Sequence, residues 1–243
     1  MIEEKHQDYI YLKENYYDNP KEIFIFLGKL IDKCSLKNNI LDIGCARGEF
    51  LYYLNKIFTE TKFTGIDYSK NLIDEAKKNL SLFNNINFEN SSGENFKLNK
   101  KYDVITLLGV LSYFDDLYKI LENIELHLND CGKVFILGFF NKYDIDVRIS
   151  YRDNKRFSNF ESGWNYHSLE NIKKVLSTLG MKINNIHNFE LSFHMEQQKD
   201  DFCRAWHINT DLGKMYTNGL GLLYNLEVIE IIKDRGGIKY DKS

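Results

Sequence analysis

The sequence predicts an α/β fold built on a doubly wound, largely parallel sheet with helices on both faces. Three observations predict it. Short apolar runs alternate with helical patterns between residues 39 and 139, glycine-containing turns separate them, and 243 residues suffice for one large domain with an insertion. A hydrophobic content of 43%, with 17 Phe and 16 Tyr, supplies the buried core that such a sheet needs.

The elements follow in order along the chain. Residues 8–34 hold two helical pieces around Pro20, and the second has the i, i+3, i+4 apolar spacing of a helix that buries one face, with Asn19 as its expected cap. The strands of the alternating part are expected at 39–43, 63–67, 86–90, 103–108 and 133–139, and its helices at 48–58, 70–82 and 117–128. Such sheets bind ligands at the carboxyl ends of their strands, which places function in the loops at 44–48, 67–69, 91–96 and 108–114.

Beyond residue 140 the pattern changes. Apolar and polar residues alternate from Tyr143 to Arg152, which predicts a half-buried strand. A capped helix is expected at 168–179, a second alternating segment at 189–195, a hairpin between 206–210 and 214–217, and a closing strand at 226–232. We therefore expect an N-terminal helical lid at 1–36, a ligand-binding core at 37–140, and a strand-rich cap with the C-terminal strands of the same sheet at 141–243.

Composition excludes several classes of protein. A net charge of −3, without a long basic run, argues against a dedicated nucleic-acid binder. No apolar stretch approaches the about 18 residues of a membrane span, and the acidic start does not have the pattern of a signal peptide. The four cysteines lie far apart, which is typical of reduced thiols and predicts a cytoplasmic protein. The sequence does not indicate an oligomeric state.

The sharpest signal is the segment around the first predicted strand. The apolar strand ends in Asp42, then Gly44 and Gly48 allow a ligand to touch the backbone, and a helix follows. Nineteen residues beyond Gly48, the second strand ends at Asp67, where an acid can accept both hydroxyls of a ribose. This spacing predicts a nucleoside-binding site.

Two nucleoside ligands compete for this site. A dinucleotide fingerprint needs small residues where Ala46 and Glu49 stand, and Glu49 would place a negative charge where a pyrophosphate meets the helix start. Asp42 instead suits a cation, and S-adenosylmethionine (SAM) carries an ammonium and a sulfonium but no phosphate. The sequence thus favours SAM. A nicotinamide-dependent oxidoreductase and a non-catalytic SAM-binding module are the alternatives.

These residues resemble motif I of class I SAM-dependent methyltransferases, and residues 65–69 resemble the ribose motif of that family. The resemblance covers about residues 38–140 and implies a Rossmann-like, seven-stranded mixed sheet. At the position of the family's adenine-facing acid this sequence has Ser92, with Glu94 nearby. The resemblance implies that the cofactor is held by Asp42, Gly44, Cys45, Ala46, Gly48, Asp67, Tyr68, Ser92, Gly93, Glu94, Leu108 and Gly109.

Residues for the methyl acceptor are expected after the fourth strand and in the second half. Methyl transfer is an in-line displacement that depends on positioning, and it needs a base only when the acceptor must lose a proton. His167, just before a helix start, is the candidate catalytic base. Arginines can hold a phosphate or carboxylate, although surface salt bridges to nearby acids explain such residues equally well. The candidate acceptor-binding residues are Tyr113, Arg148, Arg152, Trp164, Asn165 and Arg204.

Other chemistries are less well supported. The remaining histidines lack metal-like spacing with acids, so no metal is expected. The Asn-Pro-Pro-Tyr signature of amino-group nucleic-acid methyltransferases is absent after the fourth strand, which lowers the DNA-base interpretation. The 146–148 and 163–165 segments resemble bacterial small-molecule methyltransferases of surface-polysaccharide pathways. That resemblance implies a sugar, or a phosphorylated or phosphoramidate-like precursor, as acceptor, and oxygen as the methylated atom.

Overall fold

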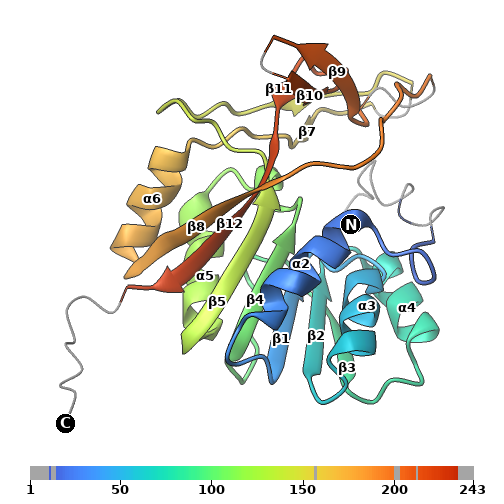
Figure 1. Ribbon diagram of the computed structural model, residues 1–243, viewed down its shortest axis with the longest axis vertical. Coiled ribbons are helices and arrows are strands. Elements are labelled where there is room, and N and C mark those ends of the chain that lie inside the picture. Colours follow the sequence, from blue (N-terminus) through green and yellow to red (C-terminus); the bar gives the residue numbers. More distant parts are fainter. Residues whose placement is uncertain (1–10, 12–14, 156–157, 200–202, 212, 235–243) are drawn as a thin grey trace.

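The computed structural model describes residues 11, 15–155, 158–199, 203–211 and 213–234 of the 243-residue chain. Its centre is a seven-stranded sheet in the order β3-β2-β1-β4-β5-β12-β8 (Figure 1). The strands are β1 (Asn39–Ile43), β2 (Lys62–Asp67), β3 (Ile86–Asn90), β4 (Tyr102–Leu108), β5 (Leu128–Gly138), β8 (Met181–Phe189) and β12 (Leu226–Lys233). The helices are α2 (Glu22–Asp32), α3 (Glu49–Ile57), α4 (Lys70–Asn79), α5 (Leu117–His127) and α6 (Leu169–Thr178), with a 3₁₀ turn η1 (Leu111–Tyr113).

The sheet confirms the predicted mixed, doubly wound architecture. Strand β1 pairs in parallel with β2 and β4, β2 pairs in parallel with β3, and β4 with β5. Strand β12 runs antiparallel to both β5 and β8. The chain winds outward from β1 to β3 and then crosses to β4, so the strand order reverses between β1 and β4. That reversal opens a crevice at the carboxyl ends of these strands, where ligands of such sheets bind.

Helices cover both faces of the sheet because each presents one apolar stripe. Helices α2, α3 and α4 pack on one face, where Leu27, Leu54 and Ala76 lie fully buried. Helices α5 and α6 pack on the other, through residues such as Ile120, Ile124 and Leu176 (Figure 1). The first helical piece expected before Pro20 lies mainly outside the described residues, as does the tail after residue 234.

A cap lies beyond the carboxyl ends of the strands (Figure 1). It contains a three-stranded sheet of β9 (Trp206–Thr210), β10 (Gly213–Thr217) and β11 (Leu223–Tyr224), and a two-stranded pair of β6 (Ser150–Tyr151) and β7 (Glu161–Ser162). The predicted hairpin is confirmed, because β9 and β10 pair antiparallel across the turn that precedes Gly213. The closing strand is confirmed as β12.

The half-buried strand predicted from Tyr143 to Arg152 is wrong. Only β6 forms there, and Tyr143 and Ile145 are 76% and 60% exposed. A tertiary contact accounts for the difference: the Asp146 carboxylate accepts hydrogen bonds from Ser168 N (2.6 Å) and from the Asn171 side-chain amide, at the start of α6. These bonds hold the segment against the start of α6 and leave Tyr143 and Ile145 in solvent.

Two further expectations are corrected at segment ends. The strand predicted at 189–195 lies earlier, because β8 covers Met181–Phe189, whose asparagine-rich outer face weakens the apolar alternation. Asn19 does not cap α2, which begins at Glu22 after Lys21 without a side-chain cap.

Candidate active site

The turn between β1 and α3 has an unusual backbone. Gly44, Ala46 and Gly48 all have left-handed φ values, +75°, +47° and +76°. A Cβ atom on Gly44 would lie 2.3 Å from Val110 Cγ2, and one on Gly48 would lie 2.5 Å from Phe88 Cζ. Glycine is therefore required here twice over, by backbone conformation and by close packing. Phe88 of β3 and Val110 of the loop after β4 therefore pack directly against the two glycines of the turn.

Asp67 ties this turn to the end of β2. Its carboxylate accepts hydrogen bonds from Ala46 N and from Ser69 N, each at 2.9 Å, and the residue is 6% exposed. A carboxylate offers about four lone-pair positions, and it is the type of acceptor that binds the hydroxyls of a ribose. The predicted ribose acid thus also fixes the strained Ala46 in its left-handed conformation.

Asp42 is the second acid of the site and is almost fully buried. Its Oδ1 accepts a hydrogen bond from the Thr106 hydroxyl at 2.7 Å. Burial raises the pKa of Asp42 to about 7, the hydroxyl opposes this rise, and the nearby Asp67 charge adds to it. A bound cation would offset both costs, whereas a pyrophosphate would add to them. The acids therefore fit the ammonium and sulfonium of SAM and disfavour a dinucleotide.

The remaining predicted cofactor residues lie at or near the same carboxyl edge. Cys45 is buried, and burial raises its thiol pKa well above the ordinary value. Ser92 Oγ accepts a hydrogen bond from Glu94 N (3.3 Å), and Gly93 packs closely against Ile120 and Ile43. Tyr68 and Leu108 are half-buried at the ends of β2 and β4. Gly109 has φ +72° and open space where a Cβ would lie. We call this carboxyl edge of the sheet the cofactor edge. It meets a cavity, described next, at Gly109.

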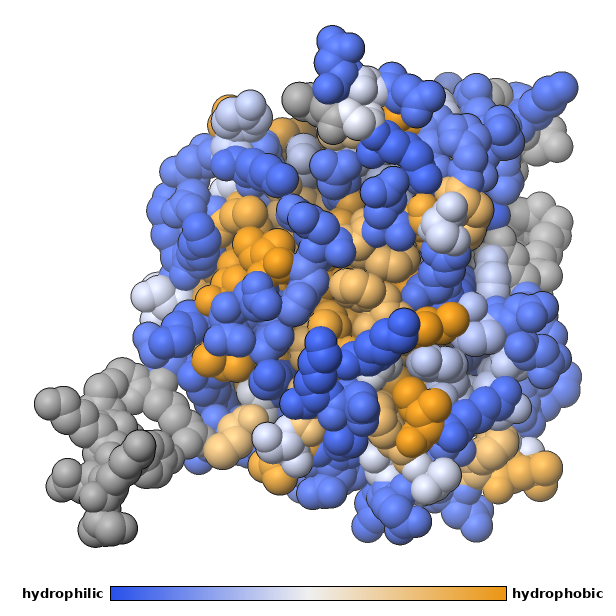
Figure 2. Space-filling model, in the orientation of Figure 1, coloured by the Kyte–Doolittle hydropathy of each residue, from blue (hydrophilic) through white to orange (hydrophobic). Residues whose placement is uncertain are grey.

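A cavity of about 570 Å³ begins at Gly109 and at Gly138, the last residue of β5. Figure 2 shows apolar side chains gathered in the middle of this face of the molecule, between the cap and α2 and framed by polar residues. The rings that line the cavity come from widely separated segments: Tyr11, Tyr16, Tyr113, Phe139, Trp164, Phe189, Phe193, Tyr216 and Tyr224. Its charged lining residues are Lys21, Glu22 and Arg204. The cavity is thus an aromatic chamber that adjoins the cofactor edge.

Three of the predicted acceptor residues, Tyr113, Trp164 and Arg204, line this cavity together. Trp164 has φ +61°, a conformation that a bulky residue rarely adopts. Its indole nitrogen is buried beside the Tyr151 hydroxyl but makes no hydrogen bond of standard geometry. Its ring stacks on Phe139 at 5.7 Å between centroids. A strained tryptophan with an unmatched N–H is the kind of feature that functional sites maintain.

Asn165 holds Trp164 in that conformation and does not line the cavity. Its backbone N donates to Ser112 O at 2.9 Å, and its side-chain amide donates to Asp115 Oδ1 at 2.8 Å. Its Oδ1 accepts from Ile149 N at 2.9 Å. Because these partners lie on both sides of it, Asn165 fastens the Trp164 segment to the loop after β4.

His167 also lies outside the cavity lining. It is 5% exposed, its Nε2 lies 3.0 Å from Phe114 O, and burial lowers its pKa. With Nε2 donating to a carbonyl, the ring joins the cap to the loop after β4. Its assignment as the catalytic base stays a prediction.

The structure also places Arg148 and Arg152 away from the cavity. Arg148 Nη2 donates to Asp115 O (3.1 Å). Arg152 donates to Asn154 Oδ1 (2.8 Å) and lies over the Phe160 ring. Both side chains are exposed. Sequence reasoning missed the lining rings Tyr16, Phe139, Phe189, Tyr216 and Tyr224, for which the only signal was the large number of Phe and Tyr.

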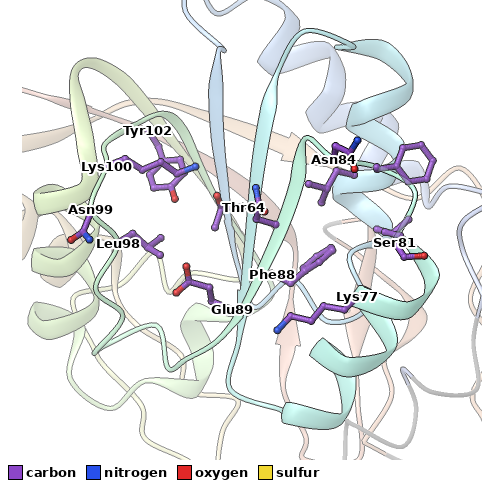
Figure 3. A pocket seen from close by; sticks show the side chains of 14 residues that line it. Thr64, Lys77, Ser81, Asn84, Phe88, Glu89, Leu98, Asn99, Lys100 and Tyr102 are labelled. Atoms are coloured by element: carbon purple, nitrogen blue, oxygen red, sulfur yellow. The ribbon is translucent and has the colours of Figure 1, made fainter.

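A second, more polar cavity of about 700 Å³ lies at the edge strand β3 (Figure 3). It forms because the connection 91–101 between β3 and β4 has no helix to cover this part of the sheet. Thr64, Glu89 and Tyr102 point into it from one side of β3, and Lys77 and Phe88 lie on the other (Figure 3). It lies toward the amino ends of β3 and β4 and contains no predicted site residue.

Within the described residues, no group of three or more His, Cys, Asp or Glu is arranged to hold a metal ion. In the same part of the chain, every helix is too short or too polar to cross a membrane.

Comparison with known proteins gives the site its context. Residues 15–186 match a family model described as "Methyltransferase domain". Malonyl-[acyl-carrier protein] O-methyltransferase 1 of Ilyobacter polytropus is 28% identical over 137 residues, which are 56% of this chain and 51% of that protein. Carboxy-S-adenosyl-L-methionine synthase of Helicobacter pylori is 28% identical over 154 residues, 59% of this chain and 64% of that protein. The match to the first relative thus spans about half of its length.

Solved structures agree on the fold. An S-adenosylmethionine-dependent methyltransferase from Clostridium acetobutylicum superposes with a TM-score of 0.58 at 14% identity. The superposition covers 94% of this chain and 96% of the other. At this identity the similarity concerns the fold, and it includes the cap as well as the central sheet.

Proposed function

The chain belongs to the methyltransferase-domain family, and from this premise we propose that it transfers the methyl group of SAM to a small polar acceptor bound in the aromatic cavity. The observation that carries the proposal is the junction at Gly109. Gly109 follows β4 at the carboxyl edge, and it also lines the cavity together with Tyr113, Trp164 and Arg204. A cofactor on the edge would present its methyl group to that cavity.

Each residue has a part in this proposal. Asp67 would accept the ribose hydroxyls and Asp42 would offset the positive charge of the amino-acid end. SAM supplies an electrophilic methyl group, so the protein's task is to align the acceptor atom with it and to exclude water. The aromatic walls serve both purposes. They offer flat faces for a ring, and they would shield a bound acceptor from water.

For the acceptor we propose a sugar, or a phosphorylated or phosphoramidate-like precursor, methylated on oxygen in surface-polysaccharide biosynthesis. Trp164 supports a sugar ring, because an aromatic face stacks on it, and Arg204 supports an anionic substituent, because a guanidinium binds oxyanions in bidentate fashion. We place the reaction in the cytoplasm, on a free small molecule, without nucleic acid. The names of the relatives suggest a second candidate, a carboxylate carried by acyl-carrier protein.

Product detection tests the proposal. The purified chain is incubated with SAM and, in parallel, with free hexoses, hexose phosphates, a phosphoramidate and malonyl-acyl-carrier protein, and methylated products are identified by mass spectrometry. Transfer to a sugar or phosphorylated oxygen supports the proposal. Transfer to the carrier-bound carboxylate alone replaces the acceptor class, and binding of S-adenosylhomocysteine (SAH) without any transfer favours the non-catalytic module. A thermal shift with NADH but not with SAH would favour the oxidoreductase.

A further inference from the structure

Residues 15–22, here called the strap, join the cofactor turn to the acceptor cavity. At one end the strap contacts the turn: Tyr16 N donates to Glu49 Oε1 at 3.0 Å, and the Tyr17 hydroxyl donates to Arg47 O at 2.5 Å. Arg47 stands between Ala46 and Gly48, two of the left-handed positions of the turn. The strap therefore binds the backbone at the point where the turn is most constrained.

A buried ion pair completes this end. Arg47 Nη2 lies 2.6 Å from Glu49 Oε1, and the two side chains are only 9% and 5% exposed. One carboxylate oxygen thus accepts from both the guanidinium of the turn and the backbone of the strap. Removing one member of a buried pair leaves the other charge without compensation, so loss of either side chain would disrupt this end of the strap. Arg47 is held twice, by its guanidinium through Glu49 and by its carbonyl through Tyr17.

The other end of the strap reaches the cap. The Glu22 carboxylate accepts hydrogen bonds from Ser192 N (2.8 Å) and from the Ser192 hydroxyl. Between the two ends, Tyr16, Asn19, Pro20 and Lys21 form part of the cavity wall. One continuous segment thus contacts the cofactor turn, lines the acceptor cavity and binds the cap.

We infer that Glu49 is a positioning residue that, with Arg47 and Tyr17, latches the strap onto the cofactor turn, so that cofactor binding and completion of the acceptor cavity are coupled. The inference rests on the proposed function. It also explains why a glutamate stands where a dinucleotide site needs a small residue: the carboxylate faces the strap and Arg47. Coupling of this kind is reciprocal, so a ligand that orders the turn also orders the strap.

The test uses two variants that perturb different parts of the latch. Glu49→Gln keeps an oxygen that can accept from Tyr16 N but removes the charge that pairs with Arg47. Tyr17→Phe removes the bond to Arg47 O and leaves the ion pair in place. Glu230→Gln is the matched control, because Glu230 forms a comparable ion pair with Lys133 (2.8 Å) on the sheet between β5 and β12.

We expect both latch variants to release SAH at least tenfold faster in stopped-flow measurements and to raise the KM for SAM more than they lower kcat. Hydrogen exchange of the Tyr16 amide should accelerate at least tenfold. In the wild-type chain SAH should slow exchange of the Ser192 amide at the far end of the strap, and in Glu49→Gln this effect should be lost. Glu230→Gln should lower the unfolding midpoint without changing any of these quantities.

Unchanged SAH release and unchanged Tyr16 exchange in Tyr17→Phe and Glu49→Gln would overturn the inference. If Glu49→Gln does not fold, Tyr17→Phe alone decides, since it leaves the buried charges paired. Failure of the proposed function has a different signature: the wild-type chain then shows no SAH binding at all, or binds it and methylates no acceptor.

Discussion

The cofactor edge and the acceptor cavity are built in opposite ways. The cofactor edge comes from consecutive strand–turn–helix units, and its residues lie within a few positions of a strand end. The walls of the acceptor cavity come from the strap, the end of β5, the segment around Trp164, the segment after β8 and the strands of the cap. The first can be recognised in a linear sequence because the backbone fixes the spacing. The second depends on how distant segments meet, which no local pattern records.

The two regions also differ in charge. Two acids are buried at the cofactor edge, and the cost of burying the charged form of Asp42 raises its pKa. The acceptor cavity is walled mainly by rings, and the predicted arginines Arg148 and Arg152 bind exposed groups elsewhere. The comparison suggests that the cofactor is selected by electrostatics and the acceptor mainly by shape and stacking.

The largest expected effect is at the cofactor edge. Asp67→Ala removes the acceptor for Ala46 N and Ser69 N as well as the proposed ribose contact. Hydrogen bonds to a charged group contribute about 1.5–3 kcal/mol, so we expect SAH affinity to fall about a hundredfold. Calorimetry measures it, with the exposed Asp74→Ala as control, since Asp74 pairs with Lys70 on the surface of α4. An unchanged dissociation constant would remove Asp67 from the site.

The second prediction concerns pH. With the Asp42 pKa at about 7, the carboxyl is largely protonated at pH 6 and charged at pH 8. The ammonium of SAH prefers the charged carboxylate, so SAH should bind about tenfold more weakly at pH 6 than at pH 8, with proton release on binding. Calorimetry in buffers of different ionisation enthalpy detects the released proton. Asp42→Asn should bind SAH weakly at both pH values, and a wild-type profile that stays flat argues against a cation at Asp42.

The Asp42 carboxyl also makes the stability of the ligand-free protein depend on pH. The folded-state pKa of Asp42 lies above the ordinary value of 3.8, so the native state binds the extra proton between about pH 4 and pH 7. Its contribution to the free energy of unfolding therefore falls as pH rises through that window in the ligand-free protein. Asp42→Asn should remove this decline.

The difference between the cofactor edge and the acceptor cavity also explains which features could be predicted from the sequence. The doubly wound core, and the placement of the glycine turn and Asp67 at strand ends, could be predicted because parallel β–α units bring the ends of their strands to one edge. The segment 143–152 was predicted wrongly because its apolar alternation does not record a tertiary contact, the hydrogen bonds that Asp146 accepts from Ser168 N and the Asn171 amide. Apart from Tyr113 and Trp164, the aromatic walls were not predicted, since rings such as Phe139 and Tyr224 resemble ordinary core residues until the cap folds over them. The fastening of Trp164 by Asn165 is likewise a tertiary feature.

The third prediction tests the cavity. Trp164→Ala removes the strained ring, and loss of one stacking contact is worth about 1 kcal/mol, so the KM for the acceptor should rise about fivefold. SAH affinity should stay within twofold. Steady-state kinetics and calorimetry on the same preparation separate the two effects, with the exposed Phe160→Ala as control. Equal losses in acceptor and SAH binding would show that Trp164 supports the whole carboxyl edge.

The smallest effect on turnover is expected at His167. The sequence predicts it as the catalytic base, whereas the structure places it outside the cavity lining. If His167 mainly joins the cap to Phe114 O, His167→Gln, whose amide can still donate there, should keep kcat within about threefold. His167→Ala should lower the free energy of unfolding by about 1 kcal/mol, because a buried carbonyl loses its donor. The burial-lowered pKa gives a further check: the native state resists protonation, so stability should decline as pH falls through the ordinary histidine value near 6.5. A catalytic base behaves differently, since both variants would then lose turnover by more than about a hundredfold and lose the acidic limb of the kcat profile. That result would assign the proton transfer to a residue behind the cavity wall and would require the cap to rearrange when the acceptor binds.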